Sequence, residues 1–140
     1  MEKVAWILLR DGKVLSTRNR GKDVFYFPGG KREPGESDTE TLVREIDEEL
    51  TVAVDPATME HFGTYEAQPH GHPQGTPFRM ICYTAAYTGT LAPANEIAEM
   101  AWLTYDDRDR VSPADQLVFD DLHATGRLPR ASGREPQHRL

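Results

Sequence analysis

Apolar residues near the start of the chain follow one another without a break. Residues 4–9 are all apolar, and the apolar pair at 14–15 follows after Asp11 and Gly12. Asp-Gly between two apolar runs is a favoured two-residue turn, so the segment predicts two strands joined by a hairpin. Because the first run does not alternate with polar residues, both of its faces should be covered. The pattern therefore predicts a sheet with helices on both sides.

Three later segments are typical of strands, because aromatic and small apolar residues dominate them. They span Met59 to Ala67, Phe78 to Tyr87 and Met100 to Leu103. Residues 113–125 instead have helical spacing, which places Leu117, Val118 and Leu122 on one apolar face. The chain thus predicts a mixture of strands and helices.

A second helix is predicted between Ser37 and Leu50. Ser37 followed by Glu40 is a capping box, which starts a helix directly behind the turn at Pro34-Gly35. One face of this helix is apolar and can be buried, and a neighbouring arc of similar width is acidic. The apolar face consists of Leu42, Val43, Ile46 and Leu50, and the acidic arc of Glu45, Glu48 and Glu49.

The acidic arc has two interpretations. Between Ser37 and Leu50 there are six acidic residues and one basic residue, Arg44, and charge runs are usually solvated helix faces. However, Glu45 and Glu49 are like charges one turn apart, which destabilises a helix. Carboxylates at this spacing converge on one point, where Mg²⁺ or Mn²⁺ could bind while keeping positions for water and phosphate. A divalent metal site is the second interpretation.

Composition narrows the class of protein. The chain has 140 residues, 38% hydrophobic and 28% charged, with a formal net charge of −7, which fits a single domain, placed at residues 1–125. A single cysteine, Cys82, excludes an internal disulfide and favours the reducing cytoplasm. The longest apolar run has six residues, far fewer than the roughly 20 that span a membrane. The excess of acids argues against duplex nucleic acid as a partner.

Arginine dominates the end of the chain. Residues 126–140 carry four arginines against one acid and contain few apolar residues; the charged positions are Arg127, Arg130, Arg134, Glu135 and Arg139. This composition predicts a basic, flexible C-terminal tail outside the domain. A basic arm that grips a phosphate-bearing ligand is the alternative.

The glutamate-rich helix and the loop before it resemble the signature of the Nudix hydrolases, G-x5-E-x7-R-E-U-x-E-E-x-G-U, where U is apolar. Gly30, Glu36 and the run Arg44-Glu45-Ile46-Asp47-Glu48-Glu49-Leu50-Thr51-Val52 match this signature except at Thr51, where the family has glycine. Pro28-Gly29-Gly30 and residues 99–103 are also similar to that family. The resemblance implies an α/β fold, a Nudix-type α/β/α sandwich around a mixed β-sheet. It also implies hydrolysis of a nucleoside diphosphate linked to another group X.

The resemblance assigns a metal site to the acidic arc. Glu45, Glu48 and Glu49 would bind Mg²⁺, with Mn²⁺ as the alternative, and the backbone carbonyl of Gly29 would be a further ligand. A carboxylate that contacts water rather than metal could accept a proton. Glu48, Glu49 and Glu96 are the candidates for that base, and the sequence does not choose among them.

Other residues are expected to support these ligands. Arg44 and Glu36 would orient the carboxylates, because an arginine fork can hold carboxylates in register, and Gly30 belongs to the same supporting loop. Family members often take another glutamate from the loop before the last strand, where Glu96 and Glu99 both qualify and Glu96 is slightly favoured. The predicted catalytic set is therefore Glu48, Glu96 and Arg44.

Thr51 is the departure from the family pattern. A glycine at this position would adopt the left-handed conformation that ends many helices, and a β-branched residue in that conformation is strained by about 1 kcal/mol. We therefore expect Thr51 to end the helix in a different conformation.

Several residues could contact the substrate. Phe27 lies where an aromatic run meets the glycine-rich loop and could stack on a nucleobase, or lie in the core of the sheet. Arg18 and Arg79 could contact phosphates, or be ordinary surface charges. The loop of residues 68–76, which contains two histidines, could close over the ligand.

Three functions follow from these residues. The favoured one is a Mg²⁺-dependent pyrophosphohydrolase that converts a nucleoside triphosphate, which could be oxidised or otherwise modified, to the monophosphate and pyrophosphate. Cleavage of ADP-ribose or another nucleotide sugar is the second, and a non-catalytic Nudix-like ligand-binding module is the third. The retained glutamates argue against the third, since like charges oppose helix stability. A small-molecule nucleotide is the expected partner, and the chain could act alone or as a homodimer.

Overall fold

The computed structural model describes residues 1–68 and 77–131. The strands are β1 (Glu2–Trp6), β2 (Leu9–Arg10), β3 (Lys13–Asn19), β4 (Gly29–Gly30), β5 (Ala53–Val54), β6 (Glu60–Ala67), β7 (Phe78–Thr84), β8 (Tyr87–Thr88) and β9 (Ile97–Leu103). The helices are α1 (Asp38–Leu50) and α2 (Pro113–Ala124), with short 3₁₀ helices at Pro56–Thr58 and Tyr105–Arg110.

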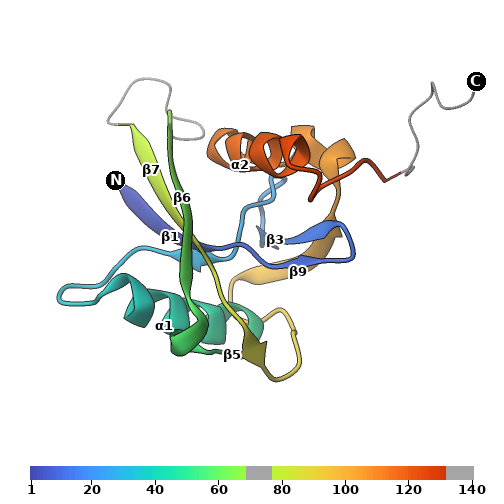
Figure 1. The fold of residues 1–140 in the computed structure, drawn as a ribbon. Helices are drawn as coiled ribbons and strands as arrows, with labels where there is room; N and C mark the ends of the chain where they lie inside the picture. Colours follow the sequence, from blue (N-terminus) through green and yellow to red (C-terminus); the bar gives the residue numbers. More distant parts are fainter. Residues whose placement is uncertain (69–76, 132–140) are drawn as a thin grey trace, which may run out of the picture.

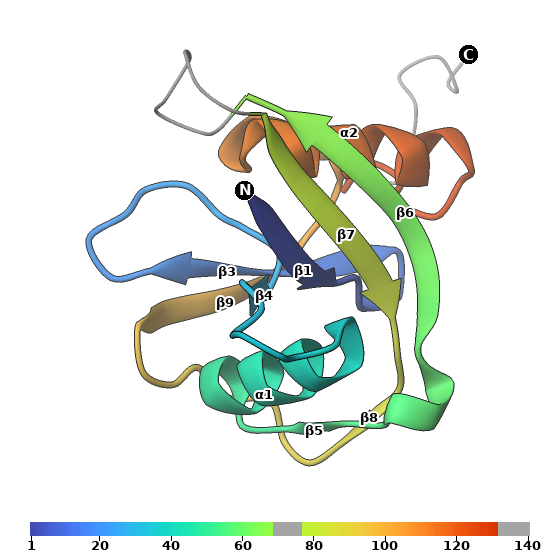
Figure 2. The same ribbon diagram turned by 90° about the vertical axis from the view of Figure 1, so that its left-hand side faces the viewer.

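The sheets lie between the two helices. One sheet has the order β4-β1-β7-β6, in which β1 and β7 are parallel and the other neighbours antiparallel, and a second has the order β2-β3-β9. The short strands β5 and β8 pair beside α1. Figures 1 and 2 show α1 on one side of these sheets and α2 on the other. The predicted α/β fold with a mixed sheet between helices is confirmed.

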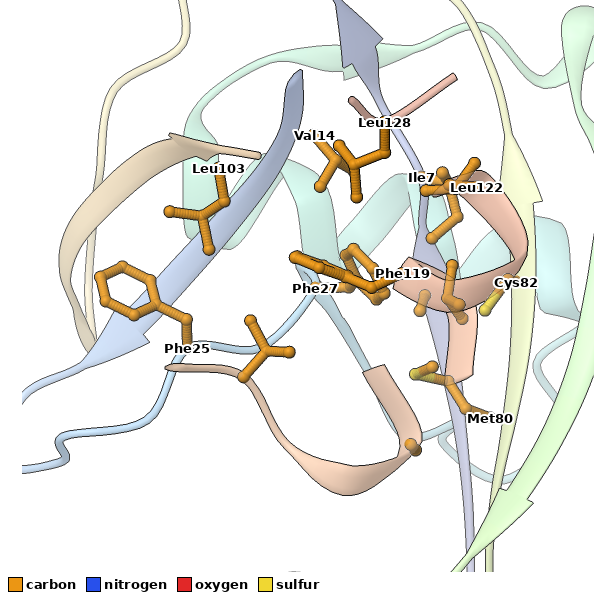
Figure 3. Packing of buried hydrophobic residues seen from close by; sticks show 14 residues of the cluster. Ile7, Val14, Phe25, Phe27, Met80, Cys82, Leu103, Phe119, Leu122 and Leu128 are labelled. Carbon is orange, nitrogen blue, oxygen red and sulfur yellow. The ribbon is translucent and has the colours of Figure 1, made fainter. Parts of the chain in front are cut away.

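Strand β1 is covered on both faces, as its unbroken apolar run predicted. Val4 and Trp6 pack in the cluster that contains the apolar face of α1, whereas Ala5 and Ile7 pack with α2. Figure 3 shows Ile7 in this second cluster, together with Phe119 and Leu122 of α2. Each fully buried apolar side chain of this size contributes about 1.5–3 kcal/mol, so the two helices are fixed to opposite faces of the same strand.

The apolar run at 4–9 does not form one continuous strand, contrary to the prediction. Strand β1 ends at Trp6, and the run continues as β2, which belongs to the other sheet. The Ile7 N–H donates to the Tyr83 carbonyl, whereas the Leu8 carbonyl accepts from the Leu15 N–H. The chain therefore passes from one sheet to the next between these two residues, and the hairpin turn follows as predicted.

The buried face of α2 differs from the predicted one at Leu117. This side chain is 39% exposed, while Val118, Phe119 and Leu122 are fully buried. Leu117 lies about 100° around the helix from Val118, on the side away from Phe119. The face is therefore centred between Val118 and Phe119.

The predicted flexible tail does not begin at residue 126. Leu128 is fully buried, and its carbonyl accepts a hydrogen bond from His123 Nδ1 at 2.9 Å. The Pro129 carbonyl accepts from the Tyr105 N–H at 3.3 Å, and Arg130 forms an ion pair with Asp106 at 3.0 Å. Residues up to 131 thus pack on the domain. The single buried leucine, Leu128, holds this segment in place, although arginine dominates its composition. The prediction for the rest of the tail falls outside the described residues.

Cys82 is buried and unpaired. Within the described ranges, no helix is long and apolar enough to span a membrane.

Candidate active site

Two glycines allow the chain to pass between β1 and α1. They form β4, which pairs with β1 in antiparallel register, Val4 opposite Gly30 and Ala5 opposite Gly29. Gly29 has φ of 144°, and a Cβ there would lie 2.0 Å from the Val4 carbonyl oxygen. A Cβ on Gly30 would lie 2.4 Å from the Glu45 carboxylate. The absence of side chains therefore lets the Glu45 carboxylate contact the β4 backbone directly.

The start of α1 is the predicted capping box. The Ser37 side chain accepts from the Glu40 N–H at 3.1 Å, and the Glu40 carboxylate accepts from the Ser37 N–H at 2.9 Å. These bonds satisfy two of the helix donors that would otherwise have no partner. They fix where the helix begins, and hence which residues face β4.

Arg44 contacts several of the carboxylates around it. Its Nε and Nη2 bond the two oxygens of Glu36 at 2.7 and 2.8 Å, and its Nη1 bonds Glu45 at 3.0 Å. The paired Arg44 guanidinium lowers the pKa of the Glu36 carboxyl to about 2, helped by the Glu33 N–H. Arg44 Nη2 also donates to the Lys31 carbonyl at 3.2 Å. Arg44 thus ties the loop to the helix and orients Glu45.

Glu49 is buried beside Glu45. It is 5% exposed, and its Oε1 accepts from the Gly29 N–H at 3.2 Å. Burial raises the pKa of the Glu49 carboxyl well above its usual range; Lys3 and the Gly29 N–H act in the opposite direction, and Glu45 raises the pKa further. Because the carboxyl groups of Glu45 and Glu49 interact directly, binding of one positive charge between them, either a proton or a metal ion, is favourable. The structure shows the N–H of Gly29 facing Glu49, whereas its carbonyl was the predicted ligand.

Glu48 is not placed with the other two glutamates. Its side chain is 52% exposed and lies 3.6 Å from Arg44 Nη1. Over residues 1–68 and 77–131, no three or more acidic, histidine or cysteine side chains are grouped so that they could hold a metal. Of the predicted trio, Glu45 and Glu49 line one cavity and Glu48 does not, although Glu45 and Glu48 both lie beside Arg44 Nη1, at 3.0 and 3.6 Å.

A cavity of about 430 Å³ opens beside these two glutamates. Gly29 and Gly30 form part of its wall, and Glu96 reaches it from the segment before β9. Its remaining lining combines cationic, aromatic and polar side chains: Lys3, Lys22 and Lys31, then Tyr26, Phe27 and Phe78, then Thr17 and Asn19. Volume and lining are typical of a site for a small molecule with both an apolar and a charged part.

Glu96 and Glu99 differ in their surroundings. Glu96 lines the cavity together with Glu45 and Glu49. Glu99 is instead paired with Arg18 across the β3–β9 register, at 2.8 Å. The slight preference for Glu96 in the sequence thus agrees with its position.

The residues predicted to contact substrate are buried in the core or form ion pairs with other side chains. Phe27 borders the cavity but is 1% exposed, and its ring centroid lies 5.9 Å from that of Phe119, so the ring lies in the core, as in its alternative role. Arg18 is held by Glu99 and by the Lys22 carbonyl. Arg79 pairs with Glu2 at 3.3 Å and does not line the cavity. The loop predicted to close over the ligand lies largely outside the described residues.

The end of α1 contradicts the expectation for Thr51. This residue has φ of 61° and ψ of 29°, the left-handed conformation that glycine would adopt. Its N–H donates to the Asp47 carbonyl at 3.0 Å, and its hydroxyl donates to the Thr90 carbonyl at 3.2 Å. These contacts offset the strain of about 1 kcal/mol, so the helix ends as in the family pattern without the glycine.

Two polar residues of this region were not singled out from the sequence. Lys3 Nζ donates to the Phe27 carbonyl at 2.6 Å, and the Phe27 N–H donates to Asp115 Oδ2 at 2.8 Å. Burial raises the pKa of Asp115 to about 6, opposed by Lys3 and by the Phe27 N–H. Asp115 lies in the first turn of α2, where acids are common, so only its burial, at 1% exposure, distinguishes it from an ordinary acid at a helix start.

Comparison with known proteins agrees with this architecture. The model of the NUDIX domain matches residues 2–122. A CTP pyrophosphohydrolase of Escherichia coli (strain K12) is 35% identical over 131 residues, which cover 89% of this chain and 92% of that protein. The solution structure of the E. coli ORF135 protein has a TM-score of 0.70 and 28% identity, covering 97% of this chain and 93% of that one. A MutT NUDIX hydrolase from Burkholderia pseudomallei has a TM-score of 0.70 at 20% identity, covering 85% and 95%.

The chain belongs to the Nudix family. The predicted fold and enzyme class, a Nudix pyrophosphohydrolase, are therefore confirmed. Membership also supports a small-molecule nucleotide as substrate and a divalent metal as cofactor.

Proposed function

We propose that the chain hydrolyses a nucleoside triphosphate, with CTP as the first candidate, to the monophosphate and pyrophosphate, using Mg²⁺ or Mn²⁺. The observation that carries this proposal is the shared cavity, in which Glu45, Glu49 and Glu96 face lysines and aromatic rings. A relative that is 35% identical bears the name CTP pyrophosphohydrolase, which is why CTP comes first. The reducing cytoplasm stays the predicted compartment.

The residues present fit a divalent cation. Glu45 and Glu49 offer hard oxygen donors, which Mg²⁺ and Mn²⁺ prefer, and Gly30 leaves room for the Glu45 carboxylate. A cation would replace the proton that burial otherwise favours on this pair. When bound, it would neutralise phosphate charge and make water more acidic. Arg44 would keep Glu45 oriented, because a carboxylate ligand needs a partner that fixes its direction.

Glu96 is our candidate for the proton acceptor. It lines the cavity and is exposed, and no ion pair holds it within the described residues. In the proposed step, a water oxygen bonds to the α-phosphorus of the triphosphate, and the bond from that phosphorus to the oxygen that bridges it to the β-phosphorus breaks. Pyrophosphate leaves, and the proton of the water passes to the Glu96 carboxylate. Glu48, which is 52% exposed and 3.6 Å from Arg44 Nη1, would be the candidate for a further ligand.

The rest of the cavity suits the rest of a nucleotide. Lys22 and Lys31 in its lining can attract the phosphates, since an ammonium group acts as a mobile point charge. Tyr26 and Phe78 can contact a nucleobase, because aromatic faces accept any base with little selectivity. These rings take the role that the sequence suggested for Phe27.

A panel of nucleotides tests the proposal. Purified protein would be incubated with MgCl2 and each of the common and oxidised nucleoside triphosphates, ADP-ribose and a nucleotide sugar, and the products identified by ³¹P NMR. We expect pyrophosphate and a monophosphate from CTP or another triphosphate. Preferred cleavage of ADP-ribose would replace the proposal by the nucleotide-sugar alternative. Tight binding of one compound without turnover of any would favour the non-catalytic module.

A further inference from the structure

The end of α1 is capped by a distant segment of the chain. The last four carbonyls of a helix have no partner within it. Here the Leu50 carbonyl accepts from the Ala92 N–H at 3.1 Å, and the Glu49 carbonyl accepts from the Ala94 N–H at 3.0 Å. The Glu48 carbonyl accepts from Asn95 Nδ2 at 2.6 Å. Figure 2 shows this segment following α1 on its way from β8 to β9.

Asn95 is fixed on its other side as well. Its own carbonyl accepts from Arg20 Nε at 3.2 Å, and the carbonyl of the next residue, Glu96, accepts from the Arg20 N–H at 2.9 Å. Asn95 has φ of 54°, a left-handed conformation that asparagine adopts more readily than most residues. The segment then turns into β9 through a bond from the Ile97 N–H to the Ala94 carbonyl.

This arrangement connects the two parts of the candidate active site. Glu45 and Glu49 lie on α1, whereas Glu96 lies 47 positions after Glu49 on a separate loop. Asn95 is the residue immediately before Glu96, and its side chain bonds the backbone of the helix that carries the other two glutamates. The side-chain amide therefore fixes the start of the Glu96 residue relative to α1.

We propose that Asn95 is a positioning residue, which holds the Glu96 carboxylate in register with Glu45 and Glu49 for hydrolysis. This rests on the function proposed above. Asparagine combines two properties that the position needs: it tolerates positive φ, and its amide donates to a carbonyl. Glycine would keep the first and lose the second. Aspartate would also lose the donor, because its ionised carboxylate would face the Glu48 carbonyl oxygen.

The competing explanation is that Asn95 only caps the helix. A cap contributes about 1 kcal/mol to stability, and its loss would affect folding without altering the chemical step. A displacement of Glu96 by about 1 Å would instead lower the rate by about 100-fold while leaving substrate binding largely intact. The two explanations therefore predict different kcat values for Asn95 variants. Only the positioning role predicts that the effect of such a variant depends on Glu96.

The test measures kcat, KM and melting temperature for CTP hydrolysis with MgCl2 in Asn95→Gly, Asn95→Asp, Glu96→Gln and the double variant Asn95→Gly/Glu96→Gln. We expect Asn95→Gly and Asn95→Asp to lower kcat by about 10- to 100-fold with KM changed less than about threefold. In the Glu96→Gln background, Asn95→Gly should have no further effect, because both changes act on one carboxylate. Thr51→Gly is the matched control: it removes the other side-chain bond between this loop and the helix end, and kcat should be unchanged.

Three results would overturn the proposal. Unchanged kcat in Asn95→Gly would show that the bond does not position Glu96. An equal loss in the wild-type and Glu96→Gln backgrounds would show that Asn95 acts on the helix alone, and the proposed hydrolysis would stand. Full turnover in Glu96→Gln would remove Glu96 from the reaction and Asn95 with it. The absence of turnover with any nucleotide would instead refute the proposed function itself.

Discussion

Alanine in place of Gly30 should abolish most of the turnover while leaving the fold intact. The added Cβ would lie 2.4 Å from the Glu45 carboxylate carbon and Oε2, and 2.7 Å from Oε1. Carbon and oxygen atoms without a bond between them need at least about 3.3 Å, since closer approach lies on the repulsive side of the van der Waals well. The carboxylate must therefore retreat by about 1 Å.

The expected losses of stability and of rate in Gly30→Ala follow from which atoms near the added Cβ can move. The clashing atoms are the end of a flexible side chain, so folding should lose only about 1 kcal/mol for a distorted Glu45 rotamer, partly offset by the lower entropy of alanine in the unfolded chain. The retreat also disturbs the 3.0 Å bond from Arg44 Nη1 to Glu45. Because a 1 Å displacement near the reacting groups can lower the rate by about 100-fold, we expect kcat/KM to fall by about that factor.

Two other glycines supply the comparison. Alanine at Gly29 would place its Cβ 2.0 Å from the backbone oxygen of Val4, which cannot retreat, so we expect this variant to lose its fold. Gly126 has φ of 78° with nothing within 4 Å of a built Cβ. Its alanine variant should lose about 1 kcal/mol of stability from strain and keep full activity.

The assay is pyrophosphate release from CTP over a range of MgCl2 concentrations, with melting temperatures by circular dichroism. We expect the Gly30→Ala variant to melt within a few degrees of wild type and to be slow at every metal concentration. Wild-type kcat/KM in a folded Gly30→Ala protein would refute the idea that Glu45 must lie against this backbone.

Three further perturbations test other parts of the structure. Arg44→Lys loses the two-bond pairing with Glu36 at 2.7 and 2.8 Å, and we expect a loss of about 10- to 100-fold in activity at limiting Mg²⁺; unchanged metal dependence would contradict the supporting role. Burial raises the pKa of Asp115 to about 6 from 3.8, so the folded state holds this proton longer and the stability it contributes falls as pH rises from about 4 to 6. The free energies of unfolding of wild type and Asp115→Asn, measured in urea, should therefore diverge by up to about 3 kcal/mol over that range. A constant difference between the two proteins would exclude the raised pKa of Asp115. Leu128→Ala should cost about 2–5 kcal/mol; a loss under about 0.5 kcal/mol would mean that the end of the chain does not pack on α2.

Features with local causes could be predicted from the sequence. The capping box at Ser37 and Glu40 depends on residues three apart, and it fixed the start of α1 to within one residue. The apolar run at the start of the chain correctly predicted a strand covered on both faces. The Nudix signature also named Arg44 and Glu36 as supporting residues, and the structure pairs their side chains at 2.7 and 2.8 Å, although the pairing itself was not predicted.

Features that depend on residues far away in the sequence could not be predicted from it. Thr51 adopts the left-handed conformation because Thr90 accepts its hydroxyl, and nothing near Thr51 in the sequence indicates this. Phe27 is buried because α2 supplies Phe119. Arg18 faces Glu99 because β3 and β9 pair in one particular register. Each of these depends on a contact between segments that the sequence pattern does not place side by side.

The requirement for a divalent cation held by Glu45 and Glu49 is central to the proposed hydrolysis. Its most direct test is the Mg²⁺ dependence of pyrophosphate release from CTP in Glu49→Gln, with Glu66→Gln, on exposed β6 surface, as the matched control. We predict that Glu49→Gln loses about 100-fold or more in kcat/KM at every Mg²⁺ concentration, while Glu66→Gln retains the wild-type curve. A folded Glu49→Gln protein with the wild-type rate and the wild-type Mg²⁺ dependence would contradict the account.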